Sequence, residues 1–544
     1  MMQEKKQNPR RKGVAVIITA GCLMGMVPVV GLAIDASLLY VVKAKLSAAA
    51  DAAALAAARS LNVGLTIGEQ EDSARSRAEA FFAANFPEGY FNTHSNSVSV
   101  VVAETAYRTR TVTVSVATTT PLYFMRVLRY DTATVRAEGK ASRRDVNLIL
   151  VLDISSSMNS GSTPTPCAMM RTAARNFVSQ FANGRDRLAL ITFSTSYKVA
   201  FSPSMNFKNS SPTLDSILAG ITCTGNTGSA QAITKAYQIL STGIHDPDIT
   251  VNGIDEPGAL NLIVFFTDGR PNGILASFPV KTASDTRHGP RRKTDGTWSG
   301  NTTDLYSTLP STCLDAEGDS YDRDAGSPVA QYVAPGWNPN WTPANKTGII
   351  TQWSGFADHG TTAGLFNYKS GGTGTISDRA GCLFSTNDRV RADVAYIPNQ
   401  DIYGNRTDCC YYTAAETHIT GRALTYADPI QLFDSGPYRG FIRPDHPFDL
   451  GKASANATDN AAQRAISDTR LDPVIYSIGL GDINPANRDG LDPVLLKRAA
   501  NVQDPQNSRY DPNCQSGLYV YAPNSTELNA AFAQVASEIL RLAR

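Results

Sequence analysis

Several of the signals that usually assign a function are missing from this sequence of 544 residues. Basic and acidic residues nearly balance, and a net charge of +1 without any DNA- or RNA-binding motif argues against nucleic acid as a partner. None of the eight cysteines forms a C-x-x-C pair or a cluster with histidine, which argues against zinc. A G-x-S-x-G nucleophile elbow is also absent and histidine occurs only six times, so a serine hydrolase is not favoured. These absences favour a binding protein over an enzyme.

Charge is absent from one long stretch near the N-terminus. The 22 residues from Gly13 to Ile34 carry none, and they follow a basic segment, residues 1–12. Such a run can span a bilayer, and the positive-inside rule then places the basic segment in the cytoplasm and everything after Asp35 outside. A cleaved signal peptide, or a lipoprotein signal cut at Cys22, would have an apolar core of only about 7–15 residues. Because the run continues well past Cys22, we expect an uncleaved transmembrane helix.

Residues 35–144 predict a small α+β unit. Apolar and alanine side chains at helical spacing indicate a helix over 36–61, and a second helix is expected over 69–86. Alternating segments at 97–103 and 110–119 predict strands. The small residues along the first helix permit close packing, either against a second copy of the chain or within the unit itself, and both alternatives stay open.

Two short blocks in this region carry a family resemblance. The span ends in G-L-A-I-D at residues 31–35, and residues 46–58 read L-S-A-A-A-D-A-A-A-L-A-A-A. Together they resemble the N-terminal region of TadG-like Flp (Tad) pilus assembly proteins. The resemblance implies the envelope of a bacterium and a role in assembling or anchoring a Flp-type pilus. Together with the orientation given by the positive-inside rule, this predicts an inner-membrane protein whose C-terminal domains are periplasmic.

Hard oxygen side chains follow a buried strand in the middle of the chain. The apolar run Val146 to Leu152 does not alternate, which is typical of a central strand in a parallel sheet covered by helices on both faces. Asp153, Ser155 and Ser157 come directly after it. Ligands bind at the carboxyl ends of such strands, and short oxygen side chains suit a divalent cation, although Asp and Ser also favour turns for structural reasons alone.

A second strand end supplies another carboxylate. Strand and helix patterns alternate after residue 146, and the apolar strand 261–266 is followed by Thr267 and Asp268, while a Gly-containing loop offers Thr227. We expect these oxygens to converge with those of the first strand at one edge of the sheet. An oxygen-only set favours Mg²⁺ or Mn²⁺ over zinc.

The motifs D-x-S-x-S, Thr and T-D-G, in this order, resemble the von Willebrand factor A (vWA) domain and its metal-ion-dependent adhesion site. The resemblance implies metal ligands at Asp153, Ser155, Ser157, Thr227 and Asp268, with Thr224 as an alternative to Thr227. It also implies that a partner protein donates a carboxylate to complete the shell. A vestigial site that holds no ion is the alternative.

The vWA pattern is interrupted by a long segment. Its continuation is expected at 459–466 and 474–481, so residues 276–455 read as an insertion that holds all four tryptophans. We expect this segment to pack beside the cation site, where its aromatic residues either form its own core or bind a partner. Disulfides are expected for Cys313, Cys382, Cys409 and Cys410 with pairing open, and a Cys167–Cys223 bridge could brace the site.

The sequence therefore predicts an α/β fold, a vWA-type parallel sheet flanked by helices, preceded by one transmembrane helix and a small α+β unit. The expected order is 1–12 cytoplasmic tail, 13–34 transmembrane helix, 35–144 TadG-like helix and α+β unit, 145–275 first vWA part, 276–455 insertion and 456–544 second vWA part. The expected function is cation-dependent protein binding in Flp pilus assembly or anchoring. The alternatives are a vWA adhesin or envelope sensor unrelated to pili, and a hydrolase with Ser155 or Ser157 as nucleophile.

Overall fold

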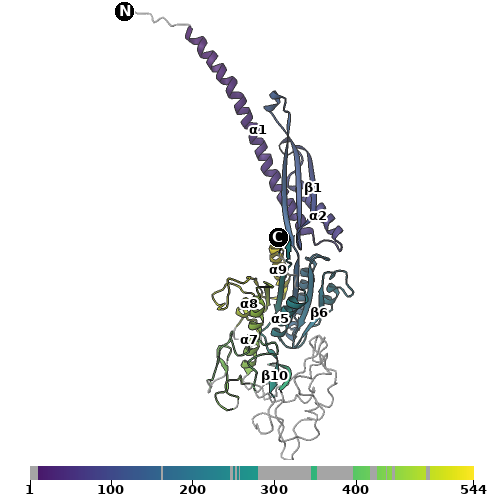
Figure 1. The fold of residues 1–544 in the computed structure, drawn as a ribbon, viewed down its shortest axis with the longest axis vertical. Helices are drawn as coiled ribbons and strands as arrows, with labels where there is room; N and C mark the ends of the chain where they lie inside the picture. Colours follow the sequence, from purple (N-terminus) through teal and green to yellow (C-terminus); the bar gives the residue numbers. More distant parts are fainter. Residues whose placement is uncertain are drawn as a thin grey trace, which may run out of the picture. The chain divides into compact units, whose positions relative to one another are not determined.

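The computed structural model describes residues 10–160, 163–244, 249–251, 254–256, 258–279, 345–351, 396–416, 419, 425–436, 438–443, 447–484 and 490–543 (Figure 1). The chain divides into two compact units, Met1–Arg144 with the last two residues, and Asp145–Leu542. The predictions for the four tryptophans, Cys313 and Cys382 lie outside the described residues.

The first unit is built on one long helix, α1 (Arg10–Ser60). The N-terminal half of α1 is apolar and exposed, as at Ile17 and Met24. Among the described residues, α1 is the one helix that is long and apolar enough to cross a membrane. Its alanine-rich C-terminal half is buried against α2 (Ile67–Asn85) and a three-stranded sheet. The expected span and the expected first helix are thus one continuous helix.

The sheet of the first unit is antiparallel, with strand order β1-β2-β3. The sequence predicted β1 (His94–Ala106) and β2 (Thr109–Pro121) but not β3 (Thr132–Arg144). β3 was missed because its inward residues are small. A Cβ at Gly139 would collide with the backbone of Ala50 in α1. A strand that lies this close to a helix presents small side chains and shows little hydrophobic alternation.

The second unit contains a six-stranded sheet in the order β15-β14-β9-β4-β5-β6. All neighbouring pairs are parallel except β5 with the edge strand β6, which is antiparallel. The strands are β4 (Val146–Asp153), β5 (Arg187–Phe193), β6 (Tyr197–Ser204), β9 (Leu260–Thr267), β14 (Val474–Leu480) and β15 (Tyr519–Ala522). The helices of this unit are α3 (Pro166–Ser179), α4 (Leu214–Ala219), α5 (Ser229–Gln238), α7 (Pro447–Ile466), α8 (Pro493–Ala499) and α9 (Leu528–Leu542). The predicted α/β fold is present.

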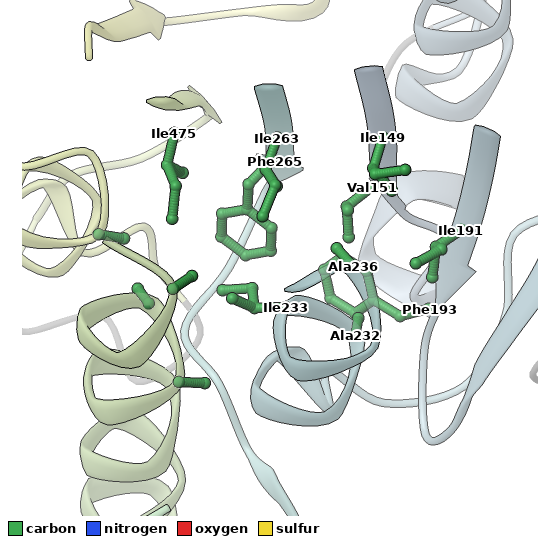
Figure 2. Packing of buried hydrophobic residues seen from close by; sticks show 14 of the residues in the cluster. Ile149, Val151, Ile191, Phe193, Ala232, Ile233, Ala236, Ile263, Phe265 and Ile475 are labelled. Carbon is green, nitrogen blue, oxygen red and sulfur yellow. The ribbon is translucent and has the colours of Figure 1, made fainter. Parts of the chain in front are cut away.

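Helices cover the sheet on both faces. On one face, side chains of the central strands such as Val151 and Phe265 pack on Ile233 of α5, and α7 lies next to α5 (Figure 2). On the other face, the Phe532 ring of α9 lies 5.7 Å from the Phe177 ring of α3 and 5.7 Å from the Phe266 ring of β9. All residues of β4 are buried, which explains why its sequence does not alternate.

The insertion of residues 276–455, here called the interrupted region of the vWA pattern, contributes short pairs of strands. β10 (Gly273–Pro279) pairs antiparallel with β11 (Asn345–Thr351), and β12 (Ala414–Ala415) pairs parallel with β13 (Ile430–Gln431). The short strands β7 (Ile249–Val251) and β8 (Ile254–Glu256) form a further hairpin. Helix α7 begins at Pro447, well before the expected start at residue 459, because buried small residues rather than large apolar ones form its contact face. Its first turns therefore lie inside the segment that the sequence assigned to the insertion.

Candidate metal centre

Asp153, the last residue of β4, is completely buried and its carboxylate is held from two sides. The backbone N–H of Ser155 donates to Oδ1 at 2.8 Å, and the Thr267 hydroxyl donates to Oδ2 at 2.6 Å. Thr267 ends the neighbouring strand β9, so the parallel register of β4 and β9 positions this contact. The sequence assigned no role to Thr267, although it is the first residue of the T-D-G motif.

Asp268 follows Thr267 and meets the two serines of the first loop. The Ser157 hydroxyl lies 2.9 Å and the Ser155 hydroxyl 3.3 Å from Oδ1 of Asp268, and the two serine oxygens are 3.0 Å apart. The carboxyl ends of β4 and β9 thus bring Asp153, Ser155, Ser157 and Asp268 into one cluster of oxygen atoms, as the strand pattern predicted.

Thr227 is held beside the segment that follows β9. Its N–H donates to the Asn272 side chain at 2.7 Å, and the N–H of Asn272 donates to the Thr227 carbonyl at 2.8 Å. Thr224 instead uses its backbone N–H to bond the Ile154 carbonyl at 2.6 Å. The Thr227 loop therefore packs against the first loop, and Asn272 is a contact that sequence motifs did not indicate.

A disulfide joins Cys167 and Cys223 with an S–S distance of 1.99 Å. Cys167 lies in the first turn of α3, and Cys223 begins the loop that carries Thr227. The bridge links two elements next to the oxygen cluster. The expected disulfides of the insertion are described only for Cys409 and Cys410, which bond to each other.

The cluster carries two desolvated carboxylates close together. Burial raises the pKa of Asp153 to about 6 and that of Asp268 to about 7, and the charge of Asp153 adds to the rise at Asp268. The ion pairs among the described residues include neither carboxylate. A bound cation would supply the missing positive charge.

The donor set fits a hard divalent cation. The structure brings together two carboxylates and the hydroxyls of Ser155 and Ser157. The vWA resemblance adds the hydroxyl of Thr227, for which the structure shows only backbone hydrogen bonds with Asn272, within the part of the chain that it describes. The described residues contain no cluster of three or more His, Cys, Asp or Glu. Oxygen donors with few charges suit Mg²⁺ or Mn²⁺, which keep part of their water shell, better than zinc.

Residues of the interrupted region contact the segment that follows Asp268. Arg270, two residues after Asp268, lies 3.7 Å from the Asp492 carboxylate and stacks on the Tyr426 ring at 4.4 Å. The Tyr411 hydroxyl donates to the same Asp492 carboxylate at 2.7 Å. These contacts are with Arg270 and Asp492 and not with the oxygen cluster itself, so the position of the insertion beside the cation site stays a prediction.

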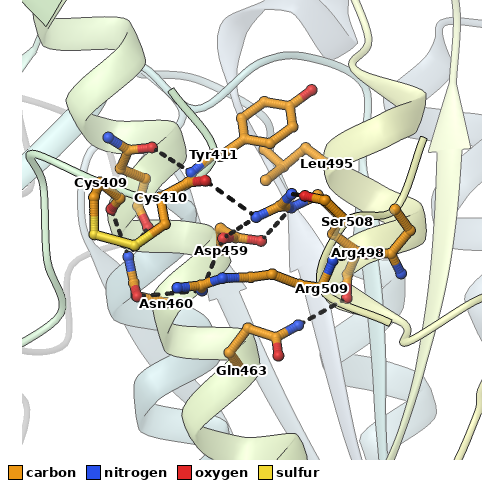
Figure 3. Close-up of polar contacts among 12 residues, drawn as sticks. Cys409, Cys410, Tyr411, Asp459, Asn460, Gln463, Leu495, Arg498, Ser508 and Arg509 are labelled. Carbon is orange, nitrogen blue, oxygen red and sulfur yellow. Dashed lines mark hydrogen bonds and ion pairs between the residues drawn. A yellow bond between two sulfur atoms is a disulfide. The ribbon is translucent and has the colours of Figure 1, made fainter. Parts of the chain in front are cut away.

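The same segment is fixed to α7 and α8 by polar contacts (Figure 3). Asp459 of α7 accepts two hydrogen bonds of 2.8 Å from Arg498 of α8 and one of 3.0 Å from Arg509. Asn460 donates to the Cys409 carbonyl at 2.7 Å, and Arg498 donates to the Cys410 carbonyl at 3.4 Å. The buried Asp459 thus positions Arg498, which in turn contacts Cys410.

Comparison with protein families identifies both parts of the chain. Residues 148–270 match the von Willebrand factor type A domain, which agrees with the fold and with the oxygen cluster at its sheet edge. Residues 13–60 match the family described as "Putative Flp pilus-assembly TadE/G-like". The chain therefore combines a Tad-type, TadE/G-like N-terminal region with a vWA domain, which confirms both sequence resemblances.

Several solved structures are similar to this chain at low identity. The pilus adhesin SpaC from Lactobacillus rhamnosus GG shows 12% identity and a TM-score of 0.33 over 82% of this chain and 34% of that chain. The vWF domain of the type V pili tip protein Mfa5 from Porphyromonas gingivalis shows 15% identity and a TM-score of 0.33 over 74% and 98%. The PilB minor pilin from Streptococcus sanguinis shows 13% identity and a TM-score of 0.33 over 84% and 80%. This chain thus spans only about a third of the SpaC chain, and these likenesses assign no function. No curated protein matches the sequence.

Proposed function

We propose that this protein is a membrane-anchored, extracytoplasmic component of Flp pilus assembly or anchoring that binds a protein partner through a divalent cation. The observation that carries the proposal is the oxygen cluster at the ends of β4 and β9, whose carboxylates Asp153 and Asp268 form no ion pair with any cationic side chain among the described residues. The TadE/G-like region supplies the pilus context.

Five residues would hold the cation: Asp153, Ser155, Ser157, Thr227 and Asp268. Thr267 and the Ser155 N–H orient the carboxylate of Asp153, and the two serines orient that of Asp268. The ion supplies an open coordination position for a carboxylate of the partner, which we take to be a pilus or envelope protein. The role of the site is binding and not catalysis.

The apolar half of α1 supports anchoring in the bacterial inner membrane, with the basic N-terminus in the cytoplasm and the vWA domain in the periplasm. Carbonate extraction of membranes and protease treatment of spheroplasts test this arrangement. The protein should stay with the membrane and its C-terminal domains should be digested from outside. Release by carbonate, or protection of the C-terminal domains, would refute it.

The decisive experiment combines metal binding and pilus assembly. Titration calorimetry of the full chain in detergent should show Mg²⁺ or Mn²⁺ binding, and Asp153→Ala should abolish it without releasing the chain from membranes. In cells that carry this variant in place of the natural chain, sheared surface fractions should contain little Flp pilin. Wild-type pilin levels together with lost cation-dependent adhesion would instead favour the adhesin or sensor alternative.

A further inference from the structure

The connection between β2 and β3 exposes an unusual number of apolar side chains. It runs from Leu122 to Asp131 and contains a single 3-10 turn, Met125–Leu128. Five large side chains in this short segment are between 41% and 84% exposed, namely Tyr123, Phe124, Val127, Leu128 and Tyr130. A contiguous apolar surface of this kind marks an interaction site.

The connection is bound to α1 at the end of the uncharged run. Asp35, the first charged residue after that run, is only 1% exposed and accepts backbone hydrogen bonds from Tyr123 at 2.9 Å, Phe124 at 2.9 Å and Met125 at 2.8 Å. These three hydrogen bonds fix the connection to the helix at this position.

One helical turn earlier, the aromatic ring of Phe124 packs against Gly31. A Cβ at Gly31 would lie 2.5 Å from Cδ1 of that ring, so glycine is needed for the contact. Gly31 belongs to the uncharged run 13–34, and the ring is therefore level with the last turn of the expected span.

The connection also carries positive charge. Arg126 pairs with Asp131 at 3.2 Å across exposed side chains, and Arg129 lies three residues further on. Aromatic rings and arginine beside an apolar surface are typical of the membrane interface, where rings sit at headgroup level and guanidinium groups reach phosphates.

We propose that residues 122–131 dip into the outer face of the same bilayer that α1 spans, with the apolar side chains among the lipids and the two arginines on anionic headgroups. This inference rests on the proposed membrane anchorage. It gives the first unit a second point of contact with the membrane, about one turn of helix away from the first.

Tryptophan fluorescence in vesicles tests this contact. The full chain with Leu128→Trp is reconstituted in phosphatidylcholine containing about a quarter phosphatidylglycerol, with or without bromine on the acyl chains. The emission of the wild-type chain, which holds four tryptophans, is subtracted. We expect the added tryptophan to be blue-shifted and to lose roughly half or more of its emission in the brominated vesicles.

The matched control is Val101→Trp on β1, which is also more than half exposed. Val101 pairs with Thr113, which precedes Pro121 by eight residues along β2, or about 26 Å at about 3.3 Å per residue. Its emission should not respond to bromine. Arg126→Gln with Arg129→Gln should remove the dependence of Leu128→Trp quenching on phosphatidylglycerol, whereas Arg59→Gln at the far end of α1 should leave it unchanged.

Flotation and carbonate resistance separate the two proposals. If the chain is anchored but Leu128→Trp is not quenched, the inference fails and the anchor stands. A blue shift without quenching by bromine would also overturn it, because the connection would then be covered by protein, such as a second copy. If the chain does not enter the vesicles, both proposals fail.

Discussion

Replacing Asp268 by asparagine should make the metal-free vWA domain more stable while removing its response to metal. The rise of the Asp268 pKa from 3.8 to about 7 corresponds to about 4 kcal/mol against the ionised form in the folded state, at about 1.36 kcal/mol per unit. Asparagine keeps the shape of the side chain and removes the charge. The pKa of about 7 already includes the hydrogen bonds that Ser155 and Ser157 donate to the ionised carboxylate, so these bonds need no separate correction. We therefore expect a stabilisation of up to about 4 kcal/mol at pH 8.

The size of this effect depends on pH. A carboxyl whose pKa is raised in the folded state holds its proton more tightly there than in the unfolded chain. The folded metal-free protein is therefore favoured below pH 3.8 and loses this contribution as the pH rises to about 7, where Asp268 becomes charged. Asp268→Asn should remove the loss, so the variant and the wild type should differ most above pH 7.

Differential scanning calorimetry of the full chain in detergent, with EDTA or with Mg²⁺, measures both parts of the prediction. In EDTA at pH 8 the variant should unfold at a higher temperature than the wild type, and Mg²⁺ should raise the unfolding temperature of the wild type alone. Asp401→Asn is the control, because burial also raises the pKa of Asp401, to about 6, but this carboxylate bonds to Asn405 outside the cluster. A less stable variant in EDTA, or a variant that still responds to Mg²⁺, would refute the reasoning.

Three further predictions concern the same centre. Thr267→Val should weaken Mg²⁺ binding about tenfold in titration calorimetry without unfolding the domain, since it removes one hydrogen bond to Asp153, worth about 1–1.5 kcal/mol; unchanged affinity would exclude this orienting role. Mg²⁺ affinity of the wild type should fall as the pH drops through about 7 and about 6, where Asp268 and Asp153 take up protons, and a flat pH profile would contradict the assignment of ligands. Cys167→Ser with Cys223→Ser removes the bridge that closes a loop of 56 residues and should lower the free energy of unfolding by about 2–4 kcal/mol in denaturant titrations. A reducing agent that breaks this bridge should lower the stability of the wild type to that of the variant, and an equally stable variant would contradict the bracing role.

The sequence predicted the convergence of the oxygen side chains where it follows directly from strand ends, and metal binding by them stays a prediction. Asp153 and Asp268 each come immediately after an apolar strand, and parallel strands bring their carboxyl ends to one edge. Two supporting contacts could not be predicted, because no local pattern encodes contacts across strands and loops. They are the hydrogen bond from Thr267 to Asp153 and the hydrogen bonds between Asn272 and Thr227. The neighbours from the interrupted region, such as Tyr411 on Asp492, are 81 residues apart in sequence and could not be paired from it.

The prediction of secondary structure failed where packing replaces hydrophobic pattern. β3 lies against the backbone of α1 and therefore uses Gly139 and alanine where a strand signal needs larger side chains. The start of α7 was hidden for the same reason, since small residues such as Ala453 and Ala457 face its neighbours. Long apolar strands and the uncharged run of α1 were predictable because each has a length and composition that a single local element can satisfy.

The linker between the first unit and the second unit is very short. β3 ends at Arg144 and β4 begins at Val146, so a single residue, Asp145, joins a strand that packs on α1 to a central strand of the vWA sheet. Under the proposed function, tension on a partner held at the cation would pass along the chain from β4 through Asp145 into β3. β3 pairs with β2 along its whole length of 13 residues, and the hydrogen bonds of an antiparallel pair are perpendicular to the strands, so a pull along β3 would load these bonds together. Such pairing would give a filament anchor of the proposed kind resistance to force through the three-stranded sheet of the first unit.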